Sequence, residues 1–206
     1  MKNYVMTSVL LGMLLTACSR NNEPAPTDSN NSMDKLHQQF HGKYKLVRSV
    51  SDMAVDLNMD GITSTDMTKE YYTLESTELR IDLRAGGLYT ADDVFVFTQA
   101  WLEQYVYTPA GNWKGELVDY EKGARVDQVH QGSSYLFTLS TDRKSLYVQA
   151  GSNQSPDSAF RWVRPESVTV ESDGRLTVVN KRRVYTSAGV KDIYITTLYQ
   201  RYTMTT

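Results

Sequence analysis

ESVTVESDGRLTVVNKRRVYTSAGVKDIYITTLYQRY, residues 166–202, is the stretch that decides the fold class. It contains three runs rich in Val, Thr, Ile and Tyr, whose branched or aromatic side chains fit a pleated strand. Asp173-Gly174 separates the first run from the second, and Ser187-Ala188-Gly189 separates the second from the third. Short connections of this kind are typical of hairpins, and they imply antiparallel neighbours. The stretch therefore predicts three consecutive antiparallel strands.

The same rhythm of runs and turns extends back to residue 77, with an ambiguous, loop-rich interval at residues 112–132. The further strand-like runs are ELRIDLR (78–84), LYTADDVFVFTQ (88–99), WLEQYVYT (101–108), SYLFTLS (134–140), SLYVQA (145–150) and FRWVR (160–164). About eight to ten strands joined by short turns must close on themselves or pair with a second sheet, because open sheet edges aggregate. We therefore predict an all-β fold, an up-and-down antiparallel barrel, with a two-sheet sandwich as the competing arrangement.

Helical segments are expected only near the N-terminal end of this region. MDKLHQQFHG, residues 33–42, predicts a short helix because Leu36 and Phe40 would share one face and Gly42 would end it. A strand is expected at about residues 43–51, and TDMTKEYYTL, residues 65–74, predicts one or two helical turns.

The N-terminus predicts export and lipidation. Lys2 precedes a short apolar run, and Leu15-Thr16-Ala17-Cys18 resembles the bacterial lipobox. We expect residues 1–17 to be a signal peptide and Cys18 to carry the lipid that attaches the protein to the membrane. The alternative is an ordinary secretory signal in which the cysteine is accidental. Cys18 is the only cysteine of the chain, so an internal disulfide is excluded.

Residues 18–33 are polar, contain two prolines and show no apolar periodicity, so they predict a flexible tether. Residues 34–206 then predict a single barrel domain. A net charge of -2 with interspersed signs provides no electrostatic footprint for nucleic acid. The densest basic cluster, Lys181-Arg182-Arg183, is expected to be solvated.

VDLNMDGITSTD, residues 55–66, begins like a calcium loop, with acidic or amide side chains at alternate positions followed by Gly61. The oxygen ligands would come from Asp56, Asn58, Asp60, the carbonyl of Ile62, and Asp66. Met67 occupies position twelve, where a bidentate acid is required, so any calcium would be structural and weakly held, at a dissociation constant on the order of 10⁻⁴ to 10⁻³ M. The alternative is a polar loop whose side chains cap their own backbone. The residues leave both interpretations open.

A family resemblance joins these features. The lipobox, the tether, GKYKLVRSV, DLNMDG and STDM resemble the opening of lipocalin-like lipoproteins of Gram-negative bacteria, with Tyr44 at the aromatic position of a G-x-W/Y-x-L strand. The motifs cover about residues 40–75. The resemblance implies a lipocalin-like barrel in the cell envelope, an outer-membrane lipoprotein of undetermined leaflet, with a small hydrophobic molecule in the barrel.

The aromatic residues are the main candidates for binding a ligand. Trp101, Tyr105 and Tyr107 lie within one strand-like run, and the two tyrosines share a strand face. They would line a cavity for a small apolar ligand. Alternatively, an exposed row would bind a glycan or a protein through the outer surface, with the barrel merely structural.

An enzyme is not expected. The chain lacks a G-x-S-x-G elbow, and its one cysteine is used for the lipid. His37 and His41 are spaced like a zinc pair but lack the intervening Glu of a metalloprotease helix, and we expect both to face solvent.

Overall fold

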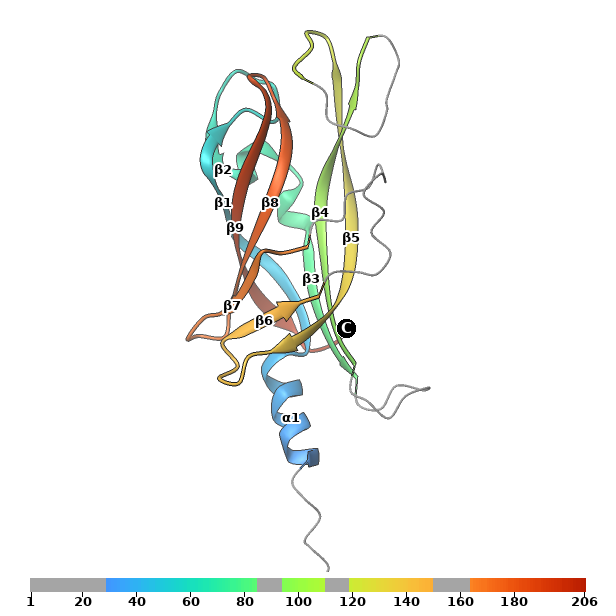
Figure 1. Cartoon of the computed structure of the whole chain (residues 1–206), viewed down its shortest axis with the longest axis vertical. Helices are drawn as coiled ribbons and strands as arrows, with labels where there is room; N and C mark the ends of the chain where they lie inside the picture. Colours follow the sequence, from blue (N-terminus) through green and yellow to red (C-terminus); the bar gives the residue numbers. More distant parts are fainter. Residues whose placement is uncertain (1–28, 85–93, 110–118, 150–163) are drawn as a thin grey trace, which may run out of the picture.

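The computed structural model describes residues 29–84, 94–109, 119–149 and 164–206, which form the arrangement in Figure 1. The helical elements are α1 (Ser29–Phe40), α2 (Met67–Glu70) and a 3-10 turn, η1 (Leu74–Ser76). The strands are β1 (Gly42–Val55), β2 (Ser64–Asp66), β3 (Glu78–Arg84), β4 (Val94–Tyr107), β5 (Arg125–Leu139), β6 (Ser145–Val148), β7 (Ser167–Val170), β8 (Leu176–Thr186) and β9 (Gly189–Thr203).

All nine strands of the described residues belong to one antiparallel sheet. Their order is β2-β1-β3-β4-β5-β6-β7-β8-β9, and an additional pairing between β1 and β9 closes eight of them into a ring. Strand β2 pairs with β1 outside this ring. The prediction of an all-β, up-and-down antiparallel barrel with one or two short helices is therefore confirmed.

The barrel wall is complete only toward the end where α1 lies, which we call the lower end. Strands β6 and β7 have four residues each, whereas β4, β5 and β9 have 14, 15 and 15. The long strands therefore extend past the closed part as two hairpins, β4–β5 and β8–β9, which separate toward the upper end in Figure 1.

Side chains of alternate strand residues fill the barrel. Along β3, Leu79, Ile81 and Leu83 are buried, as the period of two requires. The lower lumen also contains fully buried Tyr44 and Tyr199. A second apolar cluster fills the upper part with side chains from β1, α2, η1, β4, β8 and β9.

A polar layer lies between the two clusters. Gln99 and Asn180 donate their side-chain amides to each other at 3.1 Å, and Gln99 also donates to the hydroxyl of Tyr199. Ser49 and Thr197 share a hydrogen bond at 2.9 Å. Every one of these groups has a partner, which offsets the cost of burying it.

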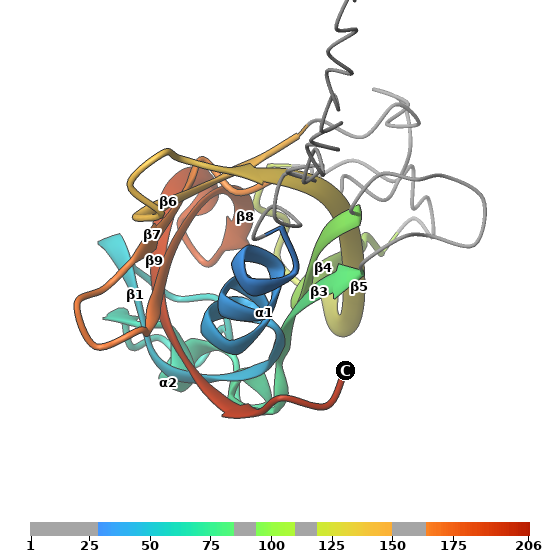
Figure 2. The ribbon, with the colours of Figure 1, turned by 90° about the horizontal axis from the view of Figure 1, so that it is seen from below.

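Helix α1 covers the lower end of the barrel, where it is seen end-on in Figure 2. Its residue Phe40 is buried, and Leu36 packs against the lower cluster, which confirms the predicted apolar face. The helix begins at Ser29 rather than at residue 33, so its first turn falls within the predicted tether. The predicted signal peptide, Cys18 and the predicted tether up to residue 28 lie outside the described residues. None of the described helices is long and apolar enough to cross a membrane.

Strands β1 and β5 are longer than predicted, and β4 is continuous through Ala100, which separates two of the predicted runs. Strand β1 continues to Val55 because both β9 and β2 pair with its second half. Strand β5 begins at Arg125, inside the interval that the pattern leaves ambiguous. The predicted turn at 85–87 and most of the run at 160–164 lie outside the described residues.

Candidate functional site

The loop after β1 directs its side-chain oxygens at its own backbone. The carboxylate of Asp56, which is 2 % exposed, accepts the backbone N–H groups of Asp60 and Gly61, each at 3.1 Å. Asn58 accepts from Asp60 N–H at 3.0 Å, and Asp60 accepts from Ile62 N–H at 2.7 Å. These are the contacts of a self-capping polar loop.

The remaining predicted ligands lie elsewhere. Asp66 caps the N-terminus of α2 by accepting from the N–H and hydroxyl of Thr68, and this lowers the pKa of the Asp66 carboxyl. The side chain of Ile62, whose carbonyl is the fourth predicted ligand, is 69 % exposed. Asp56, Asn58 and Asp60 are thus brought together by the loop, whereas Asp66 is committed to the helix.

Glu70 is the acidic residue of this region that sequence spacing does not identify. It is buried, and its carboxylate accepts Leu57 N–H at 2.7 Å across the base of the loop. Burial raises the pKa of Glu70, and the N–H groups of Leu57 and Asn58 oppose that rise. Glu70 lies three residues past the end of a twelve-residue loop, so a linear template misses it.

Among the described residues, no group of three or more His, Cys, Asp or Glu side chains is arranged to hold a metal ion. Structural calcium therefore stays a prediction, with the self-capping loop as its alternative.

A thermal melt distinguishes the two interpretations of the loop. At a dissociation constant of about 0.2 mM, we expect about 2 mM calcium to stabilise the full chain by about 1.4 kcal/mol relative to chelator. Asp60→Ala should abolish that difference, whereas the matched turn variant Asp142→Ala should retain it. Identical melting temperatures with calcium and with chelator would show that the loop serves only its own backbone.

The positions of β4 whose side chains are buried change along the strand, from odd-numbered to even-numbered residues. Phe97 and Gln99 point into the lumen, but farther up Leu102 and Val106 are the buried residues. Trp101 and Leu102 are both buried and mark the changeover. The cause is the strong twist of a long two-stranded ribbon, which Figure 1 shows for β4 and β5.

This twist turns one face of the upper β4–β5 hairpin outward. Pairs across the two strands place Glu103 opposite Val129, Tyr105 opposite Asp127, and Tyr107 opposite Arg125. We call these six residues the hairpin face. Tyr107 is 40 % and Val129 44 % exposed, whereas Tyr105 and Glu103 are half-buried.

Polar contacts hold the hairpin face in place. Gln131 donates its amide to the hydroxyl of Tyr105, and Arg125 Nε donates to Asp127 at 2.9 Å. Burial and the neighbouring carboxylate of Glu103 raise the pKa of Tyr105, so its hydroxyl stays protonated at neutral pH.

A buried cation lies at the base of this face. Arg182 is 5 % exposed, its guanidinium pairs with Glu103, and its guanidinium carbon lies 5.2 Å from the centre of the Trp101 ring. The Tyr71 ring is nearly perpendicular to the same Trp101 ring, with the two ring centroids 6.5 Å apart. Within the described part of the chain, Arg182 Nε has no hydrogen-bond partner.

The expectation that the basic triplet is solvated is thus wrong at its centre. Lys181 and Arg183 are exposed, but strand alternation places Arg182 inside, with Val178 and Val184. The three predicted ligand residues are also divided: Trp101 belongs to the core, whereas Tyr105 and Tyr107 lie on the hairpin face.

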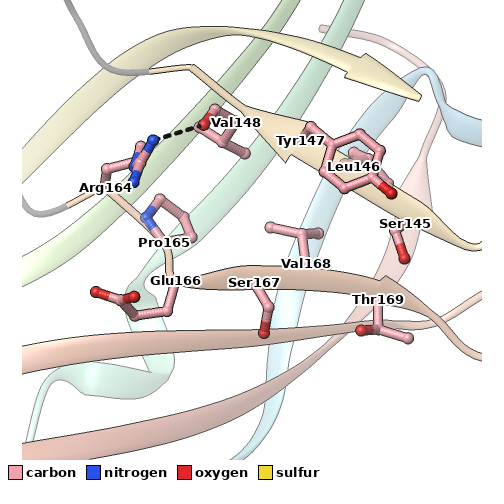
Figure 3. A pocket seen from close by; sticks show the side chains of 10 residues that line it. All are labelled: Ser145, Leu146, Tyr147, Val148, Arg164, Pro165, Glu166, Ser167, Val168 and Thr169. Atoms are coloured by element: carbon pink, nitrogen blue, oxygen red, sulfur yellow. Dashed lines mark hydrogen bonds between the residues drawn. The ribbon is translucent and has the colours of Figure 1, made fainter. Parts of the chain in front are cut away.

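A separate pocket of about 280 Å³ lies where β6 and β7 diverge (Figure 3). The two strands pair only at Ser145–Thr169 and Leu146–Val168, and the Arg164 guanidinium reaches the Val148 carbonyl at 3.5 Å. Its volume is just below the usual range for small-molecule sites, about 300–1,000 Å³. None of the predicted aromatic residues lines it.

The expectation that both His37 and His41 face solvent is wrong for His41. His41 is 8 % exposed rather than solvated, and its ring stacks on that of His37 with centroids 3.9 Å apart.

The outward-facing tyrosines therefore form the candidate site, with the Arg182–Glu103 pair beneath them. The resemblance to lipocalin-like lipoproteins stays a prediction from residues 40–75. Comparisons with protein-family models, with curated proteins and with solved structures found no match to this chain.

Proposed function

We propose that this protein is a lipid-anchored β-barrel of the bacterial cell envelope, without enzymatic activity, which binds a saccharide through its hairpin face. The observation that carries the proposal is the division of the aromatic residues. The closed part of the lumen is filled by fully buried side chains, including Tyr44, Phe97 and Tyr199. On the hairpin face, in contrast, one tyrosine is exposed and the other is half-buried. That division favours an outer surface over an enclosed apolar ligand.

The chemistry of the face suits a sugar. Tyr105 and Tyr107 are two residues apart on one strand, so their Cα atoms are spaced by about 7 Å along one face. An aromatic ring covers the apolar C–H face of a pyranose, and polar groups beside it orient the hydroxyls. Glu103 and Asp127 supply acceptors next to the rings, and Arg125 supplies donors.

The position of the face supports the same proposal. Helix α1, which leads toward Cys18, lies at the lower end, whereas the upper β4–β5 hairpin lies at the opposite end of the molecule (Figure 1). A lipid on Cys18 would therefore attach the protein by the end opposite the hairpin face.

Titration of the full chain with soluble oligosaccharides tests this function. The probes are cellohexaose, mannohexaose and hexa-N-acetylchitohexaose, with palmitate as the apolar probe, and heat is measured by calorimetry. Tyr107→Ala should weaken saccharide binding by about tenfold, equivalent to about 1.4 kcal/mol.

Tyr194→Ala is the matched control, because Tyr194 is 44 % exposed on β9. Its affinity for saccharide should equal that of the unmodified chain. Binding of palmitate without binding of any saccharide would overturn the proposal in favour of a lumenal ligand. Saccharide binding that Tyr107→Ala leaves unchanged would exclude the hairpin face.

A further inference from the structure

The histidine pair at the lower end of the barrel has a geometry that depends on its protonation. His41 directly follows the last residue of α1, and its Nδ1 accepts the backbone N–H of Leu83 on β3 at 3.2 Å. Backbone pairing between β1 and β3 ends at Gly42 and Ile81. Beyond that pair, the His41 imidazole accepts the N–H of Leu83 in place of a backbone carbonyl. A nitrogen that accepts this bond carries no proton.

We propose that His41, with the His37 ring stacked on it, forms a pH-sensitive latch, which holds α1 across the lower end of the barrel when the His41 ring is neutral and releases it when that ring is protonated. A proton on Nδ1 of His41 would oppose the N–H of Leu83 and leave that buried donor without an acceptor. A buried donor left without an acceptor destabilises the docked position of the helix.

The charged groups around His41 mostly oppose a positive ring. His37 stacks on it from α1, and Arg201 of β9 approaches as it donates to the carbonyls of Gln38 and His41, at 2.6 and 3.3 Å. Asp82 of β3 favours the charged ring from 3.8 Å, but its other carboxylate oxygen is held by Arg84 at 2.7 Å.

Burial, His37 and Arg201 together lower the pKa of His41, and Asp82 only partly offsets them. The released state therefore binds protons more readily than the latched state. The latch is fully closed above the ordinary histidine value, about 6.5, and weakens as the pH falls below it.

Release would free a specific part of the core. Phe40 is 1 % exposed, and its carbonyl accepts the hydroxyl of Tyr44 at 2.6 Å. Undocking of α1 would break this bond and expose the lower apolar cluster to solvent. Under the proposed lipid anchor, the twelve residues of α1 would then lengthen the connection between the membrane and the barrel.

Hydrogen–deuterium exchange on the full chain, from about pH 7.5 to 5.0 and corrected for intrinsic exchange rates, tests the latch. We expect the protection of α1 amides to fall by about tenfold over this range while β8 and β9 amides stay protected. His41→Gln should abolish that dependence, because a glutamine oxygen accepts from Leu83 N–H but does not titrate.

Two further variants keep the test decisive even if His41→Gln fails to fold. His37→Gln removes only the stacked neighbour and should reduce the pH dependence severalfold. His130→Gln changes an exposed histidine on β5 and should behave as the unmodified chain does. Protection of α1 that stays constant from pH 7.5 to 5.0, or that falls equally in His37→Gln, would overturn the proposal.

Discussion

Gly42→Ala is expected to destabilise the protein by about 3–5 kcal/mol. Gly42 joins α1 to β1 with φ at +135°, a conformation that L residues rarely adopt. A Cβ at this position would lie 2.2 Å from the carbonyl oxygen of Thr203 on β9. Backbone strain at about 1–3 kcal/mol and overpacking at about 1–3 kcal/mol therefore act together.

The neighbourhood of Gly42 prevents an easy relaxation. The residue pairs with Ile81, whereas Lys43 pairs with Thr203, so β3 and β9 fix the chain from both sides. Moving the backbone away from Thr203 would disturb the ladder that closes the barrel.

Urea unfolding measures this loss, with Gly61→Ala as the matched control. Gly61 also has a positive φ, at +86°, but an added Cβ there would meet no atom within 4 Å. The control should cost about 1 kcal/mol, from strain alone. Equal losses in the two variants would show that the contact between Gly42 and Thr203 does not constrain the barrel.

The strands that the sequence predicts best are those marked by turns at both ends. ELRIDLR coincides with β3, and the runs around Asp173-Gly174 become β7 and β8. Strand β5 is harder to recognise, because its residues 125–134 alternate only weakly and the strand is held by its full-length pairing with β4. Pairing with a partner strand is not visible in a local pattern.

The candidate site could be predicted in part. A period of two correctly places Tyr105 and Tyr107 on one face, but it does not show that the twist of the ribbon turns this face outward. The burial of Arg182 could have been predicted from strand alternation, because an even number of residues separates it from the apolar residues Leu176, Val178 and Val184. The adjacent basic residues concealed that alternation.

Glu103→Gln is expected to destabilise the protein by about 3 kcal/mol, because it leaves the Arg182 guanidinium buried without its carboxylate. Removing one partner of a buried pair costs about 3–5 kcal/mol, and we expect the lower end because the Glu103 side chain is 28 % exposed. The Trp101 ring next to the guanidinium cannot replace a full negative charge, since such contacts contribute about 0.5–2 kcal/mol.

The double variant Glu103→Gln with Arg182→Met separates the cost of the orphaned charge from the value of the ion pair. An apolar residue at position 182 would join the upper cluster, so the double variant should recover most of the loss in urea unfolding. Asp127→Asn breaks the solvent-exposed pair with Arg125 on the same hairpin face and should cost less than about 1 kcal/mol. If Glu103→Gln costs no more than Asp127→Asn, the Arg182 guanidinium is solvated rather than buried, and the hairpin face then lacks the rigid base on which saccharide binding by Tyr105 and Tyr107 depends.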